Sequence, residues 1–144
     1  MAGLELSPPP HPGAGVHGGR LATAALLLQV LWGIFFAGWN FRGLALVAQR
    51  QAPLGPGSSM NTALLAIGLI VALMVSARRL RAVYAAAATG LLVFAGWVLV
   101  GEITADVSQW ASEGSRVIAV GLNGLGILGA LLGLAAAAQP PRPA

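Results

Sequence analysis

The residues best suited to chemistry are four polar side chains that lie within, or at the ends of, long apolar segments. They are Asn40, Arg42, Glu102 and Asn123. Charged groups close to the hydrocarbon of a membrane are costly, and an ion pair between Arg42 and Glu102 would lower the cost of both. The four residues are therefore candidates for one outward-facing cluster that binds a proton, an ion or a small ligand. The alternative is that the charges only extend to the interface while the amides bridge helices.

The composition places these residues in a membrane protein. Hydrophobic residues make up 57% of the chain and charged residues 8%, against about 25% charged residues in a soluble domain. The net charge of +4 comes from arginines scattered over the segment ends, so we expect the lipid bilayer, and no nucleic acid, as a partner. Because there is no cysteine, disulfides, thiolate metal ligands and cysteine nucleophiles are excluded.

Four apolar segments are long enough to cross a bilayer, which requires about 20 helical residues. We predict spans at residues 21–41, 60–77, 82–101 and 117–138, within a transmembrane domain covering 20–138. Residues 1–19, which are rich in proline and glycine, are expected to be a flexible cytoplasmic tail, and residues 139–144 a second tail. The predicted fold is an all-α integral membrane protein with four transmembrane helices.

Three arginines determine the predicted orientation. Arg78, Arg79 and Arg81 lie in the short connection between the second and third spans, and arginine-rich short loops mark the cytoplasmic side of a membrane. Both termini should then be cytoplasmic. The use of arginine with no lysine favours a bacterial chain, and hence the bacterial inner membrane.

The connection between the third and fourth spans has a helical polar pattern. Glu102, Asp106, Gln109 and Glu113 recur at intervals of three or four residues, and Trp110 falls on the opposite stripe. This spacing predicts a short amphipathic helix over 102–114 that lies in the membrane interface, with Trp110 at headgroup depth.

An internal repeat relates the two halves of the chain. The sequence Phe-Ala-Gly-Trp occurs at residues 36–39 and again at 94–97. A duplication would give two tandem helical hairpins in a parallel bundle with pseudo-twofold symmetry. Chance similarity in a chain rich in alanine, glycine and leucine is the alternative.

Small residues predict where helices approach closely. Gly126, Gly129 and Gly133 fall near one face of the fourth span, and such a face lets a neighbouring backbone come near. We expect this neighbour to lie within the same bundle in preference to another subunit. Gln29 is the deepest polar residue of the first span, and Tyr84 is expected to anchor the inner interface.

The sequence contains no catalytic constellation, so we expect neither an enzyme nor a cofactor or metal site. The spans lack the paired histidines and metal ligands that a pump or redox enzyme needs. The favoured hypothesis is an accessory or structural subunit that packs against other membrane proteins. The alternative is a small transporter or channel for protons, ions or a small solute, acting as a homo-oligomer.

Overall fold

The computed structural model describes residues 19–78 and 80–140, and its regular elements over these residues are all helices. The four long helices are α1 (Arg20–Ala48), α2 (Met60–Ala77), α3 (Arg81–Thr104) and α4 (Glu113–Ala138), with a 3-10 turn, η1 (Val107–Gln109), before α4. Each long helix is long and apolar enough to cross a membrane, which confirms the prediction of four such helices. Arg79 and nearly all of the two predicted tails lie outside the described residues.

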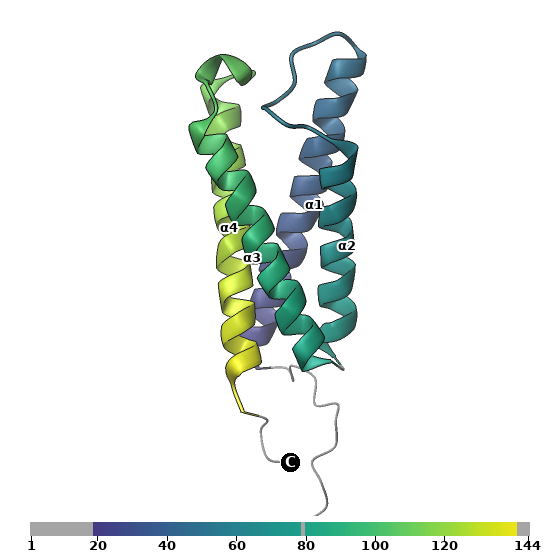
Figure 1. Cartoon of the computed structure of the whole chain (residues 1–144), viewed down its shortest axis with the longest axis vertical. Helices are drawn as coiled ribbons and strands as arrows, with labels where there is room; N and C mark the ends of the chain where they lie inside the picture. The colour runs from purple at the N-terminus through teal and green to yellow at the C-terminus, as the bar shows by residue number, and fades with distance from the viewer. Residues whose placement is uncertain (1–18, 79, 141–144) are drawn as a thin grey trace, which may run out of the picture.

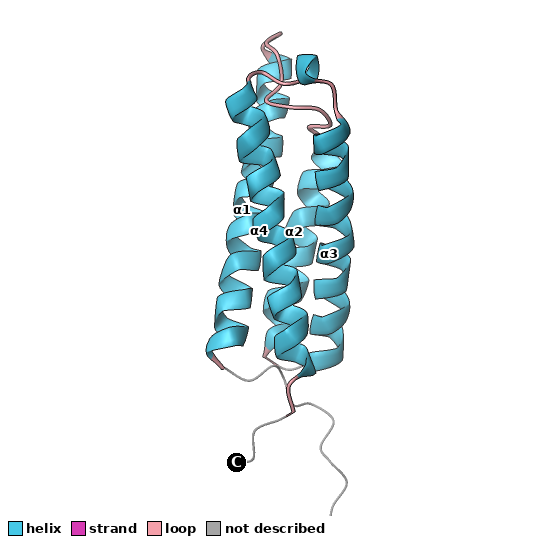
Figure 2. Ribbon diagram, turned by 90° about the vertical axis from the view of Figure 1, so that its left-hand side faces the viewer, coloured by secondary structure: helices cyan, strands magenta, loops and turns pink. Residues whose placement is uncertain are grey.

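The long helices stand side by side along one axis, as Figure 1 shows. In the view turned by 90° (Figure 2), α1 and α4 lie together on one side and α2 and α3 on the other. The α1–α4 interface is the most extensive, followed by α3–α4 and α1–α2, and the α2–α3 interface is the smallest of the four. The helices therefore form a ring in chain order, in which α1 lies diagonally opposite α3.

The two ends of the bundle differ in their connections. One end, here named the arginine end, carries Arg20 at the start of α1, the α2–α3 turn with Arg78 and Arg81, and the end of α4 (Figure 1). The other, the loop end, carries the connections 49–59 and 105–112. The Nε of Arg81 donates to the carbonyl oxygen of Ala137. This places a cation against the C-terminus of α4, where the helix dipole favours positive charge.

Side-chain caps begin two of the helices. The hydroxyl of Ser59 accepts a hydrogen bond from the backbone N–H of Thr62 and caps α2. Ser112 and Ser115 form a reciprocal capping box at the start of α4. Because each cap satisfies backbone donors that the first helical turn leaves free, these serines determine where the loops end and the helices begin.

Aromatic side chains fill the centre of the bundle. Trp32 stacks on Phe36 with ring centroids 5.0 Å apart, and both rings meet Phe94 edge-on at 6.1 and 5.6 Å. Offset and edge-to-face pairs of this kind favour a defined arrangement of the rings. The three rings, from α1 and α3, thus occupy the space between these diagonal helices.

The prediction of one amphipathic helix over residues 102–114 is wrong. The segment is divided among the end of α3, the turn η1 and the start of α4. The Asp106 carboxylate accepts a hydrogen bond from the backbone N–H of Ser108, and Ser112 caps a new helix. These local bonds satisfy backbone groups that a continuous helix would use. Trp110 is 7% exposed and lies over Gly55 of the other loop.

The repeated Phe-Ala-Gly-Trp segments have similar surroundings in part. Phe36 and Phe94 are both buried, and so are the alanines that follow them. Gly68 and Gly126 are separated by the same number of residues as Phe36 and Phe94, but their surroundings differ. A Cβ at Gly68 would meet nothing within 4 Å, whereas one at Gly126 would meet Trp32. Duplication of a helical hairpin therefore stays a prediction.

Candidate functional site

Two of the four predicted site residues meet at the loop end of the bundle. The side-chain nitrogen of Asn123, on α4, lies 3.0 Å from each carboxylate oxygen of Glu102, on α3. The side-chain oxygen of Asn123 accepts a hydrogen bond of 3.2 Å from the indole N–H of Trp32, on α1. The chain Glu102–Asn123–Trp32 therefore joins three helices through buried side chains.

Asn40 makes no hydrogen bond to Glu102, Asn123 or Trp32 and has a different set of partners. Its side-chain oxygen accepts from the backbone N–H of Ser59 and from the Thr62 hydroxyl, while its nitrogen donates to the carbonyl of Phe36. These bonds tie α1 to the first turn of α2. Asn40 thus bridges helices, as the alternative interpretation of the sequence proposed for the amides.

The ion pair expected between Arg42 and Glu102 is absent from the described part of the chain. Arg42 is exposed at the surface of α1, whereas Glu102 is 8% exposed and is engaged by Asn123. The physical reason is the face on which each residue lies: Arg42 is on the exposed face of α1, whereas Glu102 is buried against α4, which supplies Asn123 as its polar partner. A double-mutant cycle between Arg42 and Glu102 should accordingly be additive, since the groups share no contact.

A second buried polar chain lies closer to the arginine end. The Tyr84 hydroxyl, on α3, donates to the side-chain oxygen of Gln29, on α1, at 3.1 Å. The side-chain nitrogen of Gln29 donates to the backbone carbonyl of Gly129, on α4, at 3.0 Å. Sequence reasoning noted Gln29 and Tyr84 separately but did not pair them. The signal was the depth of Gln29 in an apolar segment, since a polar group there requires a partner.

The three glycines predicted for helix packing lie on the face of α4 towards these chains. A Cβ atom at Gly126 would come within 2.5 Å of the Trp32 indole, and one at Gly133 would come within 2.8 Å of the Tyr84 hydroxyl. At Gly129 the nearest atoms belong to Leu28 and Gln29, at 3.1 to 3.3 Å. The glycines therefore make room for the side chains of both polar networks.

A cavity of about 420 Å³ opens beside Glu102 at the loop end. Its walls come from α1, α2, α3 and both loops. They combine four aromatic residues, Phe36, Trp39, Trp97 and Trp110, with the polar residues Asn40, Ser58, Thr62, Glu102, Thr104 and Gln109. No described basic residue lines the cavity, so Glu102 is the charged group in its wall. Its volume falls within the range of about 300 to 1,000 Å³ that is usual for ligand sites.

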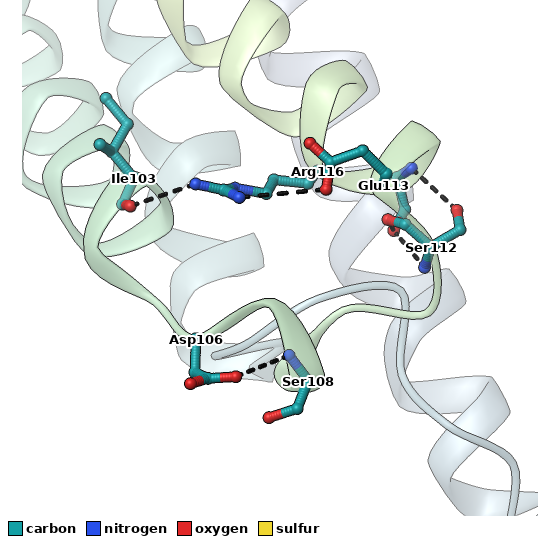
Figure 3. A network of polar contacts seen from close by, with 7 residues as sticks. Ile103, Asp106, Ser108, Ser112, Glu113 and Arg116 are labelled. Carbon is teal, nitrogen blue, oxygen red and sulfur yellow. Dashed lines mark hydrogen bonds and ion pairs between the residues drawn. The ribbon is translucent and has the colours of Figure 1, made fainter.

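Three charged residues at the loop end, Asp106, Glu113 and Arg116, make local contacts, which Figure 3 shows. Arg116 lies 3.9 Å from the Glu113 carboxylate and donates to the backbone carbonyl of Ile103. Hydrogen bonds from the side chain and backbone of Ser108 hold the pKa of Asp106 below its ordinary value. Asp106 is therefore a negative charge on the surface, and Arg116 contacts Glu113 and the backbone of Ile103.

Residues 19–78 and 80–140 contain no group of three histidine, aspartate or glutamate side chains placed to hold a metal ion. The cavity wall offers aromatic rings, hydroxyls, amides and one carboxylate as contacts for a bound molecule. In comparisons with known proteins, the chain matches no family model, no curated protein and no solved structure.

Proposed function

We propose that this protein binds a small solute in the cavity at the loop end and acts as a small membrane transporter. The observation that supports the proposal is the cavity itself, which combines aromatic walls with a few convergent polar groups and one buried carboxylate. Sites of this composition are typical of small-molecule recognition. The favoured hypothesis from the sequence, an accessory subunit, assigns no role to such a cavity.

The proposal includes a location and an orientation. The four helices would cross a bacterial inner membrane with the arginine end in the cytoplasm and the cavity open to the outer side. Arg20, Arg78 and Arg81 lie at the arginine end, whereas Asp106 and Glu113 accompany arginines at the loop end. In the full sequence Arg79 and Arg142 also adjoin the segments at the arginine end, which gives five arginines there against three (Arg42, Arg50 and Arg116) at the loop end, and this difference supports the orientation through the positive-inside rule.

Reporter fusions test the orientation. Green fluorescent protein fused after Ala144 should fluoresce, and alkaline phosphatase fused after Ser112 should be active, because the first reporter works in the cytoplasm and the second only outside it. The reciprocal fusions serve as controls. Phosphatase activity at Ala144 would contradict the assignment.

Filling the cavity tests the binding function. Gly101 lines the cavity, and a Cβ atom there would meet nothing within 4 Å. Gly101→Leu should therefore leave the helix intact while it occupies the cavity. Thermal unfolding of the purified protein should be measured against a panel of amines, amino acids, sugars and organic ions. A ligand present at a concentration of 100 times its Kd stabilises the wild-type protein by about 2.7 kcal/mol. The Gly101→Leu variant should show no such stabilisation by the ligand.

Gly96→Leu is the matched control, because Gly96 is also on α3, is equally unobstructed and does not line the cavity. It should respond to ligand as the wild-type protein does. Equal stabilisation of the Gly101 and Gly96 variants would show that solutes bind elsewhere.

The accessory-subunit hypothesis keeps one supporting observation. Gly38, Gly68, Gly121 and Gly124 have no atom of residues 19–78 or 80–140 within 4 Å of the position of a Cβ, so another helix could approach closely there. Purification in a mild detergent distinguishes the two candidates. A stable stoichiometric partner protein would support the accessory role, and a homo-oligomer without such a partner would support transport.

A further inference from the structure

We infer that the ligand of the proposed function is a cationic amphiphile, whose cationic head occupies the cavity and whose alkyl chain lies in a groove between α2 and α3. The inference rests on the proposed function, because it names the class of solute that the same cavity would take. It follows from the chemistry of the cavity wall and from a second hollow that continues it.

The cavity wall has the composition that recognises an organic cation. The electron-rich faces of tryptophan and phenylalanine attract cations such as quaternary ammonium groups, and tryptophan is the strongest of the aromatic residues in this respect. Three tryptophans and one phenylalanine line this cavity. They surround a space that is too large for a bare metal ion and suited to an alkylated ammonium head.

Glu102 supplies the complementary charge. Both of its oxygens face the Asn123 amide nitrogen, yet a carboxylate can accept about four hydrogen bonds or contacts in total. No arginine of the described chain forms an ion pair with it; the one ion pair recorded over these residues joins Arg116 and Glu113. A buried carboxylate near hydrocarbon is costly without a counter-charge, and a cationic head in the cavity would provide one.

The groove between α2 and α3 continues the cavity along the bundle. It is a hollow of about 540 Å³ lined by Asn61, Thr62, Leu65, Thr89, Gly90, Val93, Phe94 and Trp97. Thr62 and Trp97 line both hollows. The groove runs along the smallest of the four helix interfaces, and Leu65 and Val93 beside it are exposed on the outer surface.

The continuity of the two hollows determines the shape of the ligand. A groove on the outer surface of membrane-spanning helices faces acyl chains, and an alkyl chain fits its apolar walls without loss of hydration. A compact, fully hydrophilic cation would leave the groove unused. A neutral amphiphile would leave Glu102 without a counter-charge. The molecule that satisfies both hollows carries a positive head on an apolar chain, and it can enter sideways from the lipid.

Calorimetric titration of the full-length protein in maltoside micelles tests the inference, with protein-free micelles as the blank. The probes are octyltrimethylammonium, octyl glucoside as a neutral amphiphile with the same chain, and tetramethylammonium as the head alone. Octyltrimethylammonium should bind most tightly. Tetramethylammonium should bind more weakly because it lacks the chain, and octyl glucoside because it lacks the charge.

Two variants, each with a matched control, assign the parts of the ligand. Glu102→Gln should weaken octyltrimethylammonium by about tenfold or more, which corresponds to the loss of one close charge contact, whereas Glu113→Gln on the exposed surface should not. Val93→Trp should block the groove and weaken octyltrimethylammonium while tetramethylammonium binds as before. Val83→Trp, on the same helix but outside both hollows, should change neither.

The outcomes separate this inference from the proposed function. Octyl glucoside that binds as tightly as the cation, and equally to Glu102→Gln, would overturn the cationic ligand and leave a solute-binding cavity in place. A Val93→Trp variant that binds octyltrimethylammonium normally would overturn the groove. If none of the three probes binds, but another solute binds the wild-type protein and not the Gly101→Leu variant, the inference is wrong and the proposed function stands.

Discussion

Replacing Gly126 with leucine should destabilise the protein in detergent, because the new side chain would occupy the position of the Trp32 indole. A Cβ atom at residue 126 would lie 2.5 to 2.9 Å from three atoms of that ring, which is closer than packed carbon atoms allow. Trp32 is 1% exposed and is held by Phe36, Phe94 and Asn123, so it has no free space to move into. Overpacking of this kind costs about 1 to 3 kcal/mol.

The expected effects are graded along α4. Gly133→Leu should be comparable, since a Cβ there would collide with the side chain of Gln29 and the hydroxyl of Tyr84. Gly129→Leu should destabilise the protein less, because the atoms nearest to a Cβ at this position are 3.1 Å away or more. Gly121→Leu is the control, because nothing lies within 4 Å of its Cβ. The measurement is the midpoint of thermal unfolding in one detergent, and equal midpoints at residues 121 and 126 would mean that this face of α4 does not pack against α1.

The second large effect is expected for the polar chain between Tyr84, Gln29 and the carbonyl of Gly129. Gln29→Leu removes the partner of the Tyr84 hydroxyl and also the additional hydrogen bond to that carbonyl, which keeps its backbone bond within α4. A buried polar group that is left without a partner costs about 1 to 3 kcal/mol. Tyr84→Phe removes only one donor and leaves the Gln29 nitrogen bound to α4, so the single change should be less severe.

A double-mutant cycle isolates the interaction. Because Gln29→Leu already removes the partner of Tyr84, the additional change Tyr84→Phe should cost less in that background than in the wild-type protein. Coupling of about 0.5 to 3 kcal/mol is usual for groups in direct contact, although single interhelical hydrogen bonds in membranes average about 0.6 kcal/mol. Thr89→Val is the control, since its hydroxyl bonds only to its own helix at Ala85. An additive cycle would show that Gln29 and Tyr84 do not interact.

The hydrogen-bonded network of Glu102, Asn123 and Trp32 connects the cavity to the aromatic core. Asn123 links Glu102 in the cavity wall to Trp32 in the aromatic core, and Trp32 rests against Gly126. The position of the carboxylate therefore depends on the close approach of α1 and α4. A substitution at Gly126 should disturb ligand binding as well as stability, whereas one at Gly121 should disturb neither.

The sequence by itself determined the class and the local elements of this protein. Apolar segments of membrane-spanning length and the arginines between the second and third of them were sufficient to predict four long helices and most of their bounds. These features are local, because hydropathy, helix propensity and capping depend on residues within a few turns of one another. The face of α4 that carries Gly126, Gly129 and Gly133 also followed from spacing along one helix.

Only the tertiary structure decided which side chains meet. Arg42 was expected to pair with Glu102, but it lies on the exposed face of α1, whereas the buried carboxylate of Glu102 is contacted by Asn123 of α4. In the segment 102–114 the helical spacing of charges was overridden by the side-chain bonds of Asp106 and Ser112. The cavity joins residues from three helices and two loops. The rotation and register of one helix against another depend on interlocking side chains from distant parts of the chain, and no periodicity within a single segment encodes them.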